Sequence, residues 1–153
     1  MLATNLHHLP ISFVAMWGTV TEDDVEGMRR YYDECHRKGG RFVSLVDSRR
    51  SSVPTAPIRR ALTDMSNTFH ERSVRNTVCV AVVLDSKVLI GVLSALRWFL
   101  KTDADLRYFP TAAEALAWGA ERLAAEKLTV PAGAGAVVAW LDSVPDLSGL
   151  SER

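Results

Sequence analysis

Thr77-Val-Cys-Val-Ala-Val-Val-Leu84 is an uninterrupted run of apolar and β-branched residues, and no charged residue enters it from either side. A strand with one face in water alternates apolar and polar residues, whereas a strand covered on both faces is apolar throughout. We therefore expect this run to be the central strand of a sheet that carries helices on both faces.

The segment that follows, Lys87–Lys101 (KVLIGVLSALRWFLK), is too long for one strand and is rich in leucine. It predicts a buried helix, joined to the strand by a short turn at Asp85-Ser86. A buried strand that leads into a buried helix is half of a βαβ unit, so the other parts of the chain should supply further strands and helices.

Strand and helix patterns alternate along the remainder of the chain. Thr21 precedes three acidic residues and predicts the N-cap of a helix that ends at Gly39-Gly40. Thr111–Glu114 is a capping box. The predicted strands are 11–17, 41–46, 77–84 and 105–109, the predicted helices begin near residues 21, 55, 87 and 111, and residues 5–9 give a weak hairpin signal before the first strand.

Length and charge limit the class of protein. The chain has 153 residues, which suits one domain that buries about two thirds of the surface its unfolded chain exposes. Its 18 basic and 18 acidic residues give zero formal net charge, so we expect no general attraction to nucleic acid. We find neither a leader pattern nor a long apolar segment, and we expect Cys35 and Cys79 to be reduced thiols. We therefore predict a cytoplasmic protein with no stable membrane insertion.

The composition changes after residue 127. Val130–Gly135 (VPAGAG) resembles a linker, and Ala136–Leu141 (AVVAWL) is an apolar segment too short to form a domain. We therefore divide the chain into a domain at 1–127 and a C-terminal region at 128–153. The apolar segment is expected to pack back on the domain, the alternative being a docking peptide for another protein.

Several local features, taken together, resemble the SpoIIAA-like branch of the STAS superfamily over residues 10–125. They are Gly18-Thr-Val-Thr-Glu-Asp23 at the start of the first helix, the strand-end Asp47, the apolar strand at 77–84, Trp98 late in the third helix, and Arg107-Tyr-Phe-Pro-Thr-Ala-Ala-Glu-Ala-Leu-Ala-Trp118. The resemblance implies a single α/β domain with about four strands and with helices in a right-handed βα superhelix. It also implies a bacterial, non-enzymatic module that binds a partner protein or a small lipophilic or anionic ligand.

In the sigma-factor antagonists of this superfamily, an Asp-Ser-Ser-Gly motif precedes the second helix, and a partner kinase phosphorylates its first serine. Asp47-Ser48 matches the first two positions, but Arg49-Arg50 stands where Ser-Gly is expected. The resemblance implies a partner-switching regulator whose phospho-control is an open alternative. The candidate phospho-acceptors are Ser48, Ser51, Ser52 and Thr55.

Six arginines lie between residues 49 and 75, against only Asp64 and Glu71. Free N–H groups at the start of the second helix, together with arginine side chains, can hold a phosphate or a carboxylate. The alternative is a solvated basic surface with Ser52 or Thr55 as a plain N-cap. The candidate anion- or partner-binding residues are Arg49, Arg50, Arg59 and Arg60.

Residue types used in catalysis and metal binding occur without the spacing that those functions need. Ser48, His70 and Asp47 are the ingredients of a hydrolytic triad, but no Gly-x-Ser-x-Gly motif is present. The four histidines show no metal-ligand spacing. We expect neither catalysis nor a metal or cofactor site.

The predicted third helix is apolar even outside its expected inner face. An exposed helix of this kind usually meets another surface. Ile90, Gly91, Ala95 and Trp98 are therefore candidates for a homodimer interface or a lipophile site, the alternative being a row that the C-terminal segment covers.

The sequence thus predicts a binding or regulatory protein that acts through protein–protein interaction. A carrier or sensor of a small lipophilic or anionic ligand is the alternative.

Overall fold

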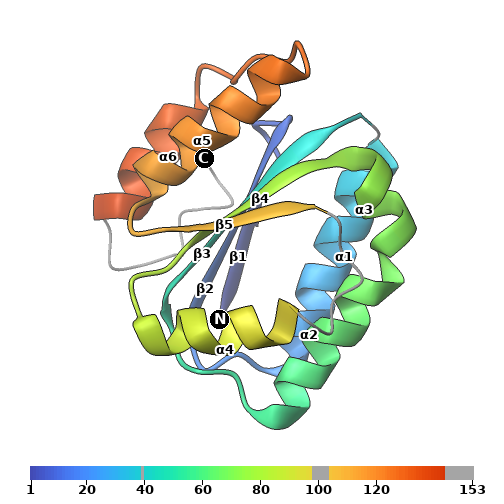
Figure 1. Cartoon of the computed structure of the whole chain (residues 1–153), viewed down its shortest axis with the longest axis vertical. Coiled ribbons are helices and arrows are strands. Elements are labelled where there is room, and N and C mark those ends of the chain that lie inside the picture. The colour runs from blue at the N-terminus through green and yellow to red at the C-terminus, as the bar shows by residue number, and fades with distance from the viewer. Residues whose placement is uncertain (39, 98–103, 144–153) are drawn as a thin grey trace.

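The computed structural model describes residues 1–38, 40–97 and 104–143. Along them, strands alternate with helices as the sequence predicts (Figure 1). In chain order the elements are β1 (Leu2–Asn5), β2 (Ile11–Gly18), α1 (Glu22–Lys38), β3 (Phe42–Ser51), α2 (Ala56–Thr68), α3 (His70–Asn76), β4 (Thr77–Val83), α4 (Lys87–Arg97), β5 (Asp105–Phe109), α5 (Ala112–Ala125) and α6 (Ala134–Ser143).

The strands within the described residues form one sheet in the order β1-β2-β3-β4-β5. β1 pairs with β2 antiparallel, and the other neighbours are parallel. The run at 77–84 forms β4, which pairs with β3 and β5, but β3 is the middle strand. The sheet has one strand more than predicted, namely β1. Residues 5–9, which gave the weak hairpin signal, mostly form the turn, and β1 before them is too short to show a sequence pattern.

Helices α5 and α6 cover one face of the sheet (Figure 1). α5 packs on β3, β4 and β5, and α6 packs on α5. Phe13, Leu45 and Val83 of the strands are fully buried here with Leu123 of α5 and Leu141 of α6. The C-terminal apolar segment is therefore a helix that belongs to the core, and it packs back on the body of the protein as expected.

Helices α1, α2 and α3 cover the other face (Figure 1). Val25 and Met28 of α1 pack with Ile58 and Met65 of α2 in a second core cluster. The expected single second helix is two helices, α2 and α3, which meet at a corner formed by Phe69.

The cover of β4 on this second face is incomplete. Val82 is 7% exposed and packs with Leu84 in a small cluster, whereas Val80, two residues before it on the same side, is only half-buried. The expectation that both faces of the 77–84 run are covered is wrong at Val80. The helices leave a pocket at this position.

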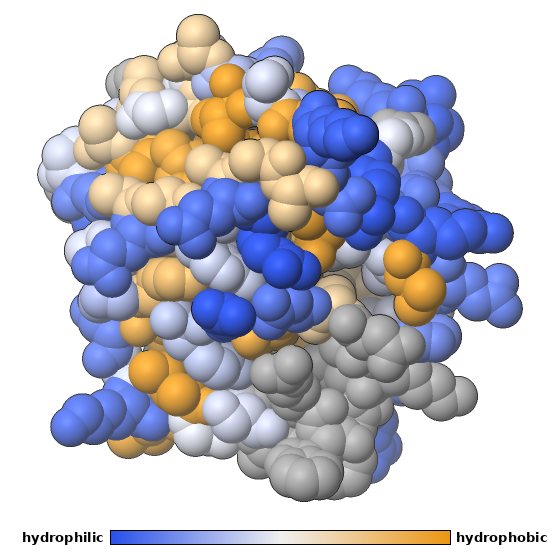
Figure 2. Space-filling view, turned by 45° about the horizontal axis from the view of Figure 1, so that its top comes forward, coloured by the Kyte–Doolittle hydropathy of each residue, from blue (hydrophilic) through white to orange (hydrophobic). Residues whose placement is uncertain are grey.

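None of the described helices combines the length and the apolar character needed to span a bilayer. On the face drawn in Figure 2, hydrophilic side chains surround several separate apolar patches.

Candidate functional site

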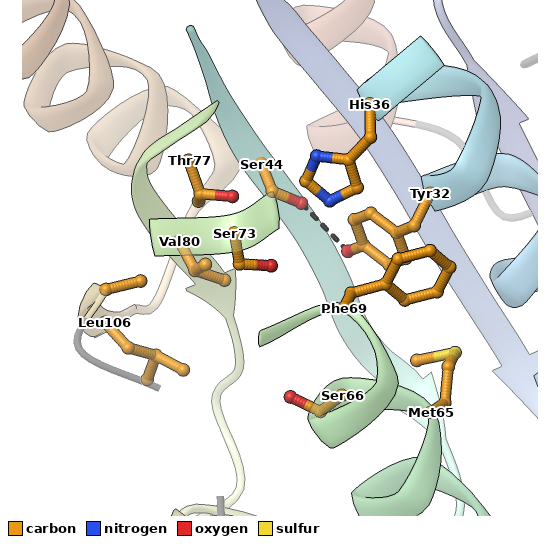
Figure 3. Close-up of a pocket in the computed structure, with 11 residues that line it drawn as sticks. Tyr32, His36, Ser44, Met65, Ser66, Phe69, Ser73, Thr77, Val80 and Leu106 are labelled. Carbon is orange, nitrogen blue, oxygen red and sulfur yellow. Dashed lines mark hydrogen bonds between the residues drawn. The ribbon is translucent and has the colours of Figure 1, made fainter. Parts of the chain in front are cut away.

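A pocket of about 160 Å³ lies where α1, the α2–α3 corner and strands β3, β4 and β5 meet. In Figure 3, Tyr32 and Phe69 stand on one side of it, with Val80 and Leu106 on the other. Each of these elements supplies lining side chains, so the pocket is a product of the tertiary fold and not of one loop.

Aromatic rings form one wall of the pocket. Tyr32 and His36 are four residues apart on α1 and therefore project from the same side of the helix. The ring of His36 stacks on Phe69 at a centroid distance of 5.5 Å, and the ring of Tyr32 lies 6.5 Å from Phe69. Because Phe69 is 6% exposed and sits at the junction of two helices, packing fixes this wall.

A partly buried hydrogen bond joins this wall to the sheet. The hydroxyl oxygens of Tyr32 and Ser44 lie 2.9 Å apart, and either can be the donor. Ser44, on the middle strand, is 1% exposed. Burial raises the pKa of Tyr32 to about 12, so the phenol stays protonated at neutral pH.

His36 is neutral in this setting. Its ring is 8% exposed and also makes an edge contact with Phe42 at 5.4 Å. Burial lowers the pKa of His36, the nearby Arg72 lowers it further, and Asp33 opposes both effects. The imidazole therefore lines the pocket as an uncharged, polarisable ring.

The rest of the lining combines apolar groups with hydroxyls. Met65, Val80 and Leu106 supply apolar surface, and serine and threonine hydroxyls supply polar atoms. Among the described lining residues there is no aspartate, glutamate, lysine or arginine. This composition suits a small, largely apolar guest with few hydrogen-bonding atoms.

No protein-family model matches the sequence, and no curated protein matches it either. Among solved structures, the fold is similar to the crystal structure of an uncharacterized protein of the DUF3478 family from Shewanella loihica, which is described as having a SpoIIAA-like fold. The TM-score is 0.60 at 15% sequence identity, and the match covers 78% of this chain and 92% of that chain. The chain has a SpoIIAA-like fold. The predicted fold class is thereby confirmed.

Within this SpoIIAA-like fold, the predicted acceptor segment is mostly strand. β3 runs through to Ser51, five residues beyond the end at residue 46 that the sequence predicts. Ser48 is 3% exposed, so a kinase cannot reach it in the folded protein. Its buried hydroxyl has no hydrogen-bond partner. Ser51 is half-buried and donates to the Ser48 carbonyl at 3.0 Å. Ser52 and Thr55 are exposed in the loop before α2.

The four candidate arginines do not assemble into one free anion site. Arg49 pairs with Asp47 and Asp142. Arg50 lies over the ring of Trp17, 4.9 Å from its centroid. Arg59 donates to the Pro54 carbonyl at 2.8 Å, whereas Arg60 is exposed. Internal partners hold three of the four, so the folded protein does not present them as one free cluster, and binding of an anion or a partner by this region stays a prediction.

The apolar row predicted on the third helix is only partly described. Ile90 packs against the Val82–Leu84 cluster, so its assignment to the outer row is wrong. Gly91 is exposed. The Ala95 side chain and Trp98 lie outside what the structure describes. The alternative, that the C-terminal segment covers this helix, is not supported, since α6 packs on α5.

The three hydrolase ingredients are not joined in a triad. Asp47 is held by Arg49, while the Ser48 hydroxyl and Nδ1 of His70 are buried without a hydrogen-bond partner. Among the described residues, no three histidine, cysteine, aspartate or glutamate side chains gather as a metal site.

Sequence reasoning missed the pocket residues. The sequence patterns single out neither Tyr32 nor Ser44 as a site residue. Two signals were available in the sequence. One is the polar Ser44 inside the apolar stretch Phe42–Val46, and the other is the four-residue spacing that places Tyr32 and His36 on one helix face.

Proposed function

We propose that this chain is a non-enzymatic binding protein that holds a small lipophilic ligand in the pocket between α1, the α2–α3 corner and β3–β5. The observation that carries the proposal is the pocket itself, an apolar space of about 160 Å³ at a gap in the cover of β4. A concave apolar site with a few converging polar groups is the usual form of a small-molecule site.

Apolar burial would drive such binding. Val80 stays half-buried in the middle of an otherwise apolar strand, and an apolar guest would complete its cover. A guest that loses about 150 Å² of apolar surface gains about 4 kcal/mol from burial. Association entropy opposes this gain, so a weak, reversible interaction is expected.

Two measurements test the proposal. Native mass spectrometry of freshly purified protein detects a retained small molecule, and an amide NMR titration with toluene as the probe locates binding. Val80→Phe fills the pocket from the strand side and should abolish the shifts. Val74→Phe makes the same change on α3, where Val74 is 50% exposed, and serves as the matched control. Equal binding by both variants contradicts the proposal.

A second candidate function, partner switching, is supported by the loop between β3 and α2. Thr55 occupies the N-cap position of α2, yet its hydroxyl makes no capping hydrogen bond. The neighbouring Val53 is 45% exposed, as suits a contact residue. A phosphate on Ser52 or Thr55 would meet the N–H groups of the first turn of α2.

Intact-mass analysis of the chain isolated from its native cells tests this second function. The expected result is a fraction heavier by one phosphate, which Ser52→Ala with Thr55→Ala removes and Ser51→Ala leaves. An unmodified chain under all growth conditions contradicts it.

A further inference from the structure

The electrostatics of the pocket select against charged guests. The described lining offers hydroxyls and one neutral imidazole but no full charge. A carboxylate or an ammonium moved into such a site loses its hydration, and the described lining residues offer it no counter-charge. The ligand is therefore expected to be neutral.

The Tyr32–Ser44 pair leaves a hydrogen-bonding position for a ligand. Each hydroxyl has one donor proton and two acceptor lone pairs, and the single bond between them uses only one proton. The pair can thus donate one further hydrogen bond and accept others. In Figure 3 the hydroxyls of Ser66, Ser73 and Thr77 also turn toward the open space.

The dimensions of the pocket match one ring. Its volume of about 160 Å³ is close to that of dry protein cavities of about 150 Å³ that take up benzene. Phe69 and His36 offer stacked ring surface, and the thioether of Met65 is a favourable neighbour for an aromatic guest.

We propose that the pocket binds a neutral, single-ring compound of the phenol class, with its ring among Phe69, Met65 and Val80 and its hydroxyl on the Tyr32–Ser44 pair. This proposal rests on the proposed ligand-binding function and narrows it. It excludes the anionic alternative for this pocket.

Amide NMR titrations with p-cresol, toluene, benzoate and hexanol test the proposal. p-Cresol should shift the pocket amides and bind about fivefold more tightly than toluene, since one added hydrogen bond is worth about 1 kcal/mol. Benzoate should not bind, because its charge has no partner. Hexanol should bind more weakly than p-cresol, because it has no ring to stack.

The variants Tyr32→Phe and Ser44→Ala separate recognition from stability. In each, the ratio of p-cresol to toluene affinity should fall toward one. A merely destabilised protein would lower both affinities together and keep the ratio, so an unchanged ratio overturns the hydroxyl assignment.

The remaining outcomes distinguish a failure of the phenol-class proposal from a failure of the proposed ligand-binding function. Benzoate binding as tight as that of p-cresol overturns neutrality, and tighter binding of hexanol overturns ring selection. In both cases the ligand-binding function survives. If none of the four probes shifts the pocket amides, the proposed function fails together with this inference.

Discussion

Arg49 in β3 and Asp142 in α6, 93 residues apart in the chain, form an ion pair in which Nη1 donates to Oδ1 at 2.7 Å. The same carboxylate accepts hydrogen bonds from the backbone N–H groups of Ala112 and Ala113, at 2.9 and 3.1 Å. One side chain of the C-terminal helix therefore binds both the middle strand and the first turn of α5.

Asp142→Ala should lower the free energy of unfolding by about 1–2 kcal/mol, because it removes a capping acceptor and one partner of Arg49. Asp142→Asn should cost less, since its amide oxygen can still accept from the α5 N–H groups. Urea unfolding measures both changes. Glu121→Ala, on the exposed side of α5, is the control. A parent-like midpoint for Asp142→Ala would show that α6 is not held in this way.

The same carboxylate predicts a dependence on pH. Burial raises the pKa of Asp142, but hydrogen bonds from Ala112, Arg49 and Ala113 outweigh it and hold the pKa below its usual value. A carboxyl whose pKa is lowered by folding stabilises the protein above its unfolded pKa of about 4 and loses that contribution as the pH falls through the folded value.

The difference in stability between the parent and Asp142→Asn should therefore be constant near neutral pH and shrink below about pH 4. Urea unfolding over a pH series measures it. A difference that grows on acidification would mean that the carboxylate is not stabilised in the folded state.

The sequence was sufficient to predict elements that carry complete local signals. Thr111 of the predicted capping box is the N-cap of α5, and its hydroxyl accepts from the Glu114 N–H at 3.2 Å. The apolar run at 77–84 is an inner strand of the sheet. In both cases, the residues that decide the structure are neighbours in the chain.

Local sequence patterns did not predict contacts between residues that lie far apart in the chain. Ser48, Arg49 and Arg50 resemble a polar turn, but β3 continues through them and pairs with β2 again at Arg50 and Ser51, after a register shift between Ala15 and Trp17. Asp142 and the ring of Trp17 hold the two arginines, and neither contact has a local signature. The pocket was missed for the same reason, because residues from six elements line it and no motif within one element marks it.

Gly133→Ala should destabilise the fold by about 1–3 kcal/mol. A Cβ at Gly133 would lie 2.3 Å from Cε1 of His8, so the C-terminal region and the N-terminal hairpin turn are in close contact. Gly135→Ala is the matched control on α6, since a Cβ there meets no atom within 4 Å. Thermal unfolding should show that His8→Ala relieves part of the Gly133→Ala defect. Additive effects in this double-mutant cycle would contradict the contact.

Gly91 tests the homodimer hypothesis. It is exposed on α4, and a Cβ there meets no atom within 4 Å, so Gly91→Ala should stabilise the helix by about 0.5–1 kcal/mol. If a second copy binds this surface, Gly91→Glu should lose the dimer mass in native mass spectrometry while Gly91→Ala keeps it. A monomeric parent, or a Gly91→Glu dimer, would rule out an interface here.

Val82→Asp should prevent folding. Val82 is 7% exposed in β4, opposite Val46 of β3 and Tyr108 of β5, and packs in the cluster with Leu84. A carboxylate at this position loses its water, and the neighbouring side chains are apolar or aromatic, so the penalty of several kcal/mol approaches the whole stability of a domain this size.

Circular dichroism and thermal unfolding measure the effect of Val82→Asp against Val74→Asp, which makes the same change at a half-exposed position of α3. Val74→Asp should remain soluble and melt cooperatively, since its carboxylate stays in water. Val82→Thr replaces one methyl group by a hydroxyl at nearly the same volume and should fold with a stability lower by about 1–3 kcal/mol. If Val82→Asp also melts cooperatively, water reaches this side of β4 well beyond Val80, and the pocket is larger than its lining residues define.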